Sequence, residues 1–378
     1  MKKYVSKALA GIFLAAAMSF SGCSGSGGAS VGDGEAVTGS VTGNAVPEEA
    51  EQVTSETAAS VPANIQVSVT STDEGTPFGQ HGKISVSGTD LVDKNGEKFQ
   101  LYGMSTHGIA WYPKYVSYPT FKTLREDWNT NCVRLAMYTD ENLGYCSNGD
   151  KEELKELVRS GVEYADRLGM YVIIDWHILN DHDPNVYKDE AIKFFSEMSE
   201  LYKDHDNILY EICNEPNTTA DWGAVKSYAE EVIPVIRGND GDAVIIVGTP
   251  SWCQELDKAL ADPLDYDNLM YSLHFYADTH RDWLRERAES CIQSGLPVFV
   301  SEFNICDASG RGNVNTEEGE KWFELIETYN LSYMCWSMAN NSDSCCVIAA
   351  DNAKMSNWTD EELSESGRWV VGKFRAEE

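Results

Sequence analysis

Short apolar runs alternate with longer amphipathic stretches over most of the chain. Eight of these runs have the length and the mainly apolar character of buried strands. Strands are therefore expected over residues 98–103, 131–138, 170–176, 208–212, 243–247, 269–273, 297–300 and 331–336.

The stretches between the runs repeat their apolar residues at helical spacing. The clearest example places Leu154, Val158 and Val162 on one face, and the Gly169 that follows is typical of a helix C-terminus. Helices are also expected over residues 191–202, 225–236, 283–292 and 316–329.

Strands that alternate with helices predict parallel βα units joined by right-handed crossovers. Eight such units in roughly 300 residues fit a (β/α)8 TIM barrel, which we expect to span residues 81–378. A doubly wound open sheet is the alternative, but no glycine-rich phosphate loop follows any of the runs. Ahead of the first unit, an N-terminal β-hairpin that turns at Asn95-Gly96 is expected to cap the bottom of the barrel.

The segment that precedes the barrel has a different composition. Residues 1–22 combine a basic start with a short apolar stretch, and with the following cysteine they resemble a bacterial lipoprotein signal peptide. This resemblance implies export, lipidation of Cys23, and an extracellular, cell-surface protein held to the membrane by that lipid anchor. Residues 23–80 are rich in Gly, Ser, Thr and Glu and almost free of aromatic residues, so a disordered tether is expected there.

Charge and cysteine content limit the partners of the chain. The formal net charge of −32 disfavours nucleic acid and anionic membrane surfaces, since both are negatively charged. Of the ten cysteines, nine follow Cys23 without regular spacing, so we expect mostly free thiols rather than a disulfide framework or a zinc site. The protein is expected to be a monomer.

The motif YEICNEPN, residues 210–217, begins as a buried strand but ends in polar residues and a proline. Pro216 cannot continue a strand, so Asn214 and Glu215 are expected at its carboxyl end, where (β/α)8 barrels bind their ligands. An isolated Asn-Glu pair is more often a helix cap or a solvated loop, so the ends of the other strands are informative. They contain or lead into His107, Trp111, Arg134, Tyr138, His177, His274, Tyr276, Glu302 and Trp336.

Two glutamates on one rim, with aromatic residues around them, are the arrangement that glycoside hydrolysis requires. One carboxylic acid protonates the leaving oxygen, while a second carboxylate attacks the anomeric carbon or activates water. Arg134 supports this interpretation, because a guanidinium inside an apolar strand is costly to bury unless it meets a carboxylate. Glu302 is the expected partner of Arg134.

Residues 82–375 resemble glycoside hydrolase family 5, and within it the bacterial endo-β-1,4-glucanases. The resemblance rests on HGIAWY, VRLAMY, VIIDWH, YEICNEPN, HFYA, VFVSEF and CWSM, which occur in the order typical of the family. It implies that Glu215 is the acid/base and Glu302 the nucleophile of a retaining double displacement, with Arg134 and Tyr276 supporting Glu302. Substrate-binding roles are implied for His107, Trp111, Tyr138, His177, Asn214, Trp252, His274 and Trp336.

The implied enzyme is a secreted endo-β-1,4-glucanase, a cellulase that acts on cellulose or soluble β-glucans without a cofactor or metal ion. Glu302 beside Arg134 is expected to have a lowered pKa, and Glu215 to remain protonated. The chain departs from the family pattern at Phe303, where tryptophan is usual, and at Asn341, where related glucanases commonly carry a lysine that binds a distal sugar. Binding at that distal position is therefore left open.

Other functions are compatible with parts of this pattern. A mannanase, xyloglucanase or mixed-linkage glucanase could use the same scaffold, because contacts to single hydroxyl groups separate these substrates. A non-catalytic carbohydrate-binding surface lipoprotein would need only the aromatic residues. A metal-dependent hydrolase could use the histidines, but they lack the His-x-x-x-His spacing of zinc-binding helices.

Overall fold

The computed structural model describes residues 70–377, in which eight parallel strands close into a barrel with the order β10-β3-β4-β5-β6-β7-β8-β9. Pairing of β10 with β3, through Tyr333 and Tyr102, completes the ring. The predicted (β/α)8 barrel is thus confirmed, and the open doubly wound sheet is excluded. The barrel strands are β3 (Tyr102–Thr106), β4 (Cys132–Tyr138), β5 (Tyr171–His177), β6 (Ile208–Glu211), β7 (Val244–Val247), β8 (Leu269–Tyr276), β9 (Val298–Asn304) and β10 (Tyr333–Met338).

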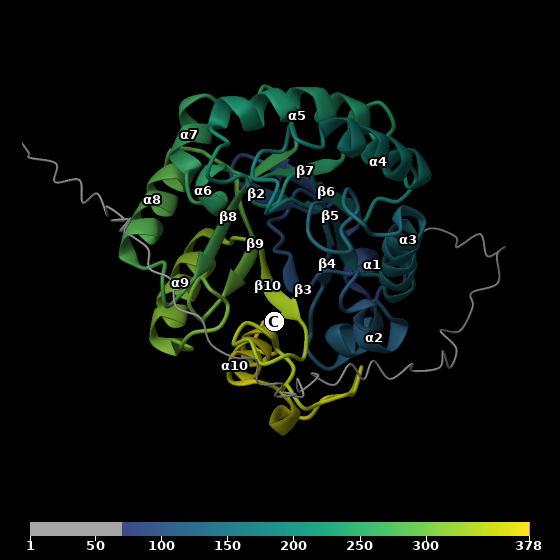
Figure 1. The fold of residues 1–378 in the computed structure, drawn as a ribbon, viewed down its shortest axis with the longest axis vertical. Coiled ribbons are helices and arrows are strands. Elements are labelled where there is room, and N and C mark those ends of the chain that lie inside the picture. The colour runs from purple at the N-terminus through teal and green to yellow at the C-terminus, as the bar shows by residue number, and fades with distance from the viewer. Residues whose placement is uncertain (1–69, 378) are drawn as a thin grey trace, which may run out of the picture. The chain divides into compact units, whose positions relative to one another are not determined.

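Helices surround the strands, as Figure 1 shows. The longest, α3, begins where the Asp150 side chain accepts hydrogen bonds from two backbone N–H groups of the first turn, and ends at Gly169 in the left-handed conformation. Its inner face buries Leu154, Val158 and Val162, as the apolar spacing predicts. The helices are α1 (Pro77–His81), α2 (Tyr118–Glu126), α3 (Lys151–Leu168), α4 (Lys188–Leu201), α5 (Trp222–Arg237), α6 (Pro250–Cys253), α7 (Leu256–Ala261), α8 (Asp282–Gln293), α9 (Thr316–Tyr329) and α10 (Glu365–Phe374).

Several strands differ in length or position from the apolar runs that predicted them. β8 and β9 extend to Tyr276 and Asn304, beyond the expected ends at residues 273 and 300. The added residues include the polar His274 and Glu302, which an apolar pattern does not register. β3 begins at Tyr102 rather than at residue 98, because residues 98–101 cross the bottom of the barrel instead.

The N-terminal hairpin consists of β1 (Ser85–Ser87) and β2 (Asp90–Val92), which pair in antiparallel fashion. Its turn contains Gly88 in the left-handed conformation, so β1 and β2 are joined one turn earlier than the predicted turn at Asn95-Gly96. Asn95-Gly96 forms a second turn, after which Lys98 bridges to Val92. The apolar residues of this region cover the amino-terminal end of the barrel, as expected: Ile84, Leu91 and Phe99 pack in one cluster with Cys132 and Tyr171, the first residues of β4 and β5.

The folded unit also extends further upstream than predicted. The expected tether reaches residue 80, but Thr70 is buried, and its hydroxyl lies within hydrogen-bond distance of Asp166 and Asn207. The Phe78 side chain is buried, and its backbone N–H donates to the carbonyl of Gly169. The predicted signal peptide, Cys23 and the tether as far as residue 69 lie outside the described residues.

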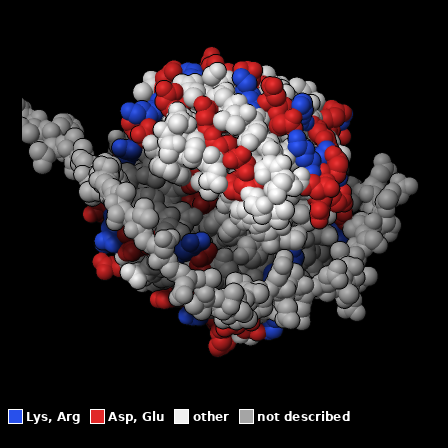
Figure 2. Space-filling model, viewed as in Figure 1, with Lys and Arg blue, Asp and Glu red and all other residues white. Residues whose placement is uncertain are grey.

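The visible surface of the described residues carries more acidic than basic side chains, with both kinds interspersed (Figure 2). This distribution follows from a composition of 61 acidic and 29 basic residues. Within residues 70–377, no helix is both long enough and apolar enough to span a membrane.

Candidate active site

A cleft of about 630 Å³ lies at the carboxyl-terminal end of the barrel, where the polar strand ends were expected to meet. Both predicted catalytic glutamates, Glu215 and Glu302, line it. The other lining residues are His107, Tyr138, His177, Leu179, Trp252, Gln254, His274, Tyr276, His280, Ala308, Ser309, Gly310, Arg311, Trp336, Asp343 and Cys345.

Glu215 is held by the main chain that follows β6. The backbone N–H of Glu215 donates to the carbonyl of Ile178, 3.3 Å away, which ties this segment to the end of β5. On the other side, Gly248, the residue after β7, packs closely against this segment. A Cβ at position 248 would lie 2.2 Å from the Cys213 carbonyl oxygen. Only glycine permits this approach, so the chain that precedes Glu215 is fixed between two strands.

Glu302 lies within β9, and only 4% of its surface is exposed. Its Oε1 accepts a hydrogen bond of 2.7 Å from the Tyr276 hydroxyl, and its Oε2 accepts one of 3.2 Å from Nη1 of Arg134. The expected contacts of Glu302 with Arg134 and Tyr276 are therefore both present. They orient the carboxylate and use both of its oxygens.

Arg134 is completely buried and is shared among three carboxylates. Besides Glu302, its Nε contacts Glu211 at 2.7 Å and its Nη2 contacts Asp175 at 3.0 Å. Glu211 and Asp175 were not identified from the sequence as partners of Arg134. Each is a carboxylate inside an apolar strand, which is the same signal that identified Arg134.

The two glutamates have unequal pKa values. Burial is the main cause in both cases, and it raises the pKa of Glu302 to about 7 and that of Glu215 to about 8. The predicted lowering of the Glu302 pKa is wrong, because burial outweighs a cation that two other carboxylates share. The raised pKa of Glu215 agrees with the expectation that this residue stays protonated.

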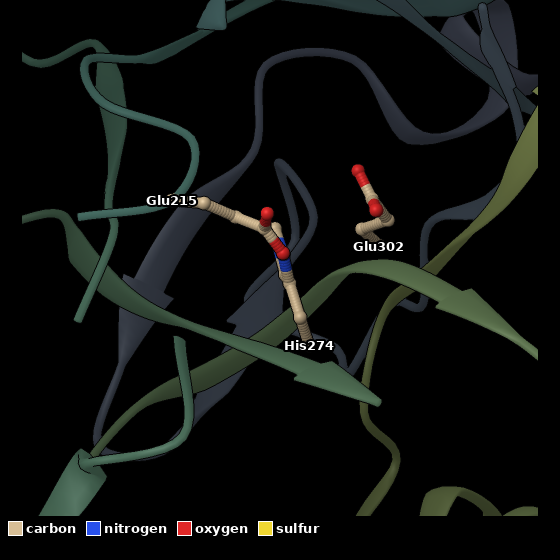
Figure 3. Close-up of side chains that lie close together, drawn as sticks. All are labelled: Glu215, His274 and Glu302. Carbon is tan, nitrogen blue, oxygen red and sulfur yellow. The ribbon is translucent and has the colours of Figure 1, made fainter. Parts of the chain in front are cut away.

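A chain of hydrogen bonds accounts for that proton. The Ser301 hydroxyl donates to Glu211 at 2.7 Å, so it can only accept from Nε2 of His274, 3.0 Å away. Burial lowers the pKa of His274 to about 4, so the ring is neutral and its Nδ1 carries a lone pair. In this tautomer Nδ1, 2.9 Å from Oε1 of Glu215, accepts a hydrogen bond from the protonated carboxyl group. Figure 3 shows the His274 ring meeting the Glu215 carboxyl group, with Glu302 nearby.

Six of the eight predicted substrate-binding residues line the cleft, whereas Asn214 and Trp111 do not. Asn214 is fully buried, and its side-chain oxygen accepts a hydrogen bond of 2.6 Å from Nη2 of Arg134. Its amide nitrogen donates to the Ile178 carbonyl, 3.1 Å away. Trp111 packs on Tyr138, with ring centroids 4.6 Å apart. The residues that line the cleft are His107, Tyr138, His177, Trp252, His274 and Trp336.

Asn341 does not line the cleft either. Its side chain contacts Asp343 and Cys346, at distances of 2.8–3.1 Å. A different cation lines the cleft near this loop: Arg311, whose side chain is 76% exposed and pairs with Asp343 at 3.0 Å. Arg311 could not be identified from the sequence, because nothing in its local pattern distinguishes it from other surface arginines.

Glu215, His274 and Glu302 are also the one group among residues 70–377 whose donor atoms could together hold a metal ion, since one atom of each lies within 4.8 Å of the others.

A pair of glutamates at this spacing, one protonated and the other able to ionise near neutral pH, defines a glycoside hydrolase. Sugar binding alone would not require such a pair.

Comparison with known proteins identifies the family. Residues 92–342 match the family described as cellulase (glycosyl hydrolase family 5), and the chain belongs to it. Endoglucanase A of Butyrivibrio fibrisolvens is 49% identical over 297 residues, which cover 78% of this chain and 69% of the relative. An endoglucanase of Clostridium saccharobutylicum is 43% identical over 298 residues, which cover 78% of this chain and 65% of the relative.

Among solved structures, a variant of the catalytic domain of the Thermobifida fusca endoglucanase Cel5A, in complex with cellotetraose, superimposes with a TM-score of 0.75. It is 36% identical, and the match covers 80% of this chain and all of the solved domain, 100%. The chain thus spans about two thirds of the length of the two endoglucanases above. It spans the whole length of the solved Thermobifida fusca catalytic domain.

Proposed function

We propose that the protein is a secreted, cell-surface endo-β-1,4-glucanase that cleaves internal bonds of cellulose or soluble β-glucans with retention of configuration. One observation carries the retaining mechanism: oxygens of Glu215 and Glu302 lie within 4.8 Å of each other. Retaining enzymes place their two carboxyl groups about 5 Å apart, whereas inverting enzymes separate them by about 6.5–9.5 Å to admit a water molecule. The endoglucanase names of the relatives and the cellotetraose in the solved structure support the substrate class.

In the first step, the ionised carboxylate of Glu302 attacks the anomeric carbon, and Glu215 gives its proton to the glycosidic oxygen. The bond to the leaving sugar breaks as the bond to Glu302 forms, which leaves a covalent glycosyl-enzyme. The Tyr276 hydroxyl and the Arg134 guanidinium contact the two oxygens of Glu302 and hold the attacking group in position. Neutral His274 accepts from protonated Glu215 and so holds the acid beside the scissile bond.

In the second step, the ionised Glu215 removes a proton from water, and the resulting hydroxide attacks the anomeric carbon. The bond to Glu302 breaks, and the sugar leaves with its original β configuration after two inversions. Trp336 borders the cleft between His107 and His177, with ring centroids 4.9 and 5.0 Å away, and offers an aromatic face to a sugar ring.

Leaving-group dependence and azide rescue distinguish the two glutamates. We expect Glu215→Ala to be severely impaired on polysaccharide but much less impaired in glycosylation by an aryl glycoside whose leaving group needs no proton. Azide needs no general base, so it should rescue the second step and give a β-glycosyl azide. Glu302→Ala should be inactive on both substrates, and any azide product should have the α configuration.

Equal leaving-group dependence and equal azide stereochemistry in the two variants would refute these roles. Reducing-sugar release from purified cellulose, mannan, xyloglucan and mixed-linkage glucan separates the possible substrates. Faster release from any of the last three than from β-1,4-glucan would replace the proposed substrate.

A further inference from the structure

Two tryptophans are prominent on the surface of the described residues. The chain has ten tryptophans, and within residues 70–377 Trp252 and Trp283 are the two most exposed, at 40% and 47%. Trp252, on α6, lines the cleft. Trp283 lies in the first turn of α8, outside the lining residues, and neither the catalytic chemistry nor the predicted substrate contacts involve it.

The Trp283 ring contacts two neighbours, Arg287 and His280. The guanidinium of Arg287 lies 5.7 Å from the centre of its ring, and Nη1 of the same arginine donates to the Gln254 carbonyl at 2.9 Å. Gln254 lines the cleft two residues after Trp252. Arg287 therefore links the Trp283 indole to the loop that carries the other exposed tryptophan.

The second neighbour is His280, which also lines the cleft. Its ring meets the Trp283 ring edge to face, with centroids 6.0 Å apart. His280 is fixed in turn, because its Nδ1 accepts from the Tyr276 backbone N–H and its carbonyl accepts from the Trp322 indole, at 2.9 and 2.7 Å. The exposed indole is thus supported through a short series of contacts by the strand that carries Tyr276.

An exposed indole that is fixed in position has little conformational entropy to lose on binding, and sugar rings present apolar faces that suit it. We propose that Trp283 is an outer binding platform for a β-1,4-linked glucan chain that leaves the cleft past Trp252. This inference rests on the proposed function. Continuity with the cleft identifies the occupant, because His280, which contacts the Trp283 ring, and Gln254, which accepts a hydrogen bond from Arg287, both line the cleft.

The platform should affect long substrates only. We expect Trp283→Ala to raise the KM for cellohexaose about tenfold, because a stacked sugar face buries part of the indole. It should weaken adsorption to insoluble cellulose, while kcat and KM for an aryl cellobioside remain at wild-type values. Trp283→Phe, which keeps an aromatic face, should restore most of the loss. Leu201→Ala is the matched control, since Leu201 is 49% exposed and lies on α4.

The possible outcomes are distinct. Unchanged cellohexaose kinetics in Trp283→Ala, with an active wild-type enzyme, would overturn the platform and leave the proposed function intact. An equal loss on cellohexaose and the aryl cellobioside would also overturn it, because it would indicate a general structural role. A wild-type enzyme that hydrolyses neither substrate would refute the proposed function, and the platform with it.

Discussion

Replacing Glu215 with glutamine should abolish turnover of polysaccharide and, at the same time, stabilise the fold in a pH-dependent manner. Burial raises the pKa of Glu215 from 4.5 to about 8, and its side chain is only 12% exposed. The folded protein therefore keeps a proton that the unfolded chain releases. The contribution of Glu215 to stability is complete below pH 4.5 and is lost as the pH rises towards 8.

The magnitude follows from linkage, in which one pKa unit corresponds to about 1.4 kcal/mol. The loss of stability caused by Glu215 is about 1 kcal/mol at pH 5 and about 4 kcal/mol at pH 8. Glutamine avoids this loss, because it is neutral at both pH values and can still donate a hydrogen bond to Nδ1 of His274. The advantage of Glu215→Gln over wild type should thus grow by about 3 kcal/mol from pH 5 to pH 8.

Urea unfolding of both proteins at the two pH values measures this difference. Glu324→Gln is the control, because Glu324 lies on the exposed side of α9, and its replacement should leave the unfolding free energy unchanged. A Glu215→Gln advantage that is constant, or that is smaller at pH 8 than at pH 5, would show that Glu215 is not held protonated by burial.

Two further predictions concern the pH profile and the N-terminal segment. Activity requires Glu302 ionised and Glu215 protonated, so the plot of kcat/KM against pH should be bell-shaped with limbs near pH 7 and pH 8. A plateau of kcat/KM that continues down to pH 5 would contradict the raised pKa of Glu302. Removal of residues 1–69 should leave activity unchanged and release the protein from membranes, and Cys23→Ser should have the same two effects. Removal of residues 1–80 should lower the midpoint of thermal unfolding, because it also deletes the buried Thr70 and Phe78. Equal midpoints for the two truncated proteins would contradict the packing of residues 70–80.

The barrel could be predicted from the sequence because each strand is an apolar run and each helix has an apolar stripe. The positions of Glu215 and Glu302 followed from the same reasoning, since the carboxyl ends of parallel strands share one rim. The extensions of β8 and β9 could not be predicted in this way, because His274 and Glu302 interrupt the apolar pattern while the backbone continues to pair.

The electrostatics of the site were less predictable than its location. A sequence shows that Arg134 needs a partner, but not that Glu211, Asp175 and Glu302 all contact it. The sign of the Glu302 pKa change depends on that sharing and on burial, and both arise only when four strands meet. The sequence likewise does not distinguish Trp283 from other tryptophans, since the contacts of its ring with His280 and Arg287 arise only in the fold.

The order of strands in the barrel divides the catalytic machinery between two consecutive halves of the chain. β3 to β6 supply Arg134 and lead to Glu215, whereas β7 to β10 supply Tyr276, Glu302 and Trp336. Neither half contains both glutamates, so hydrolysis requires the two halves to be assembled together. Turnover would therefore report the association of the two halves, and two separately produced halves would act as a complementation pair.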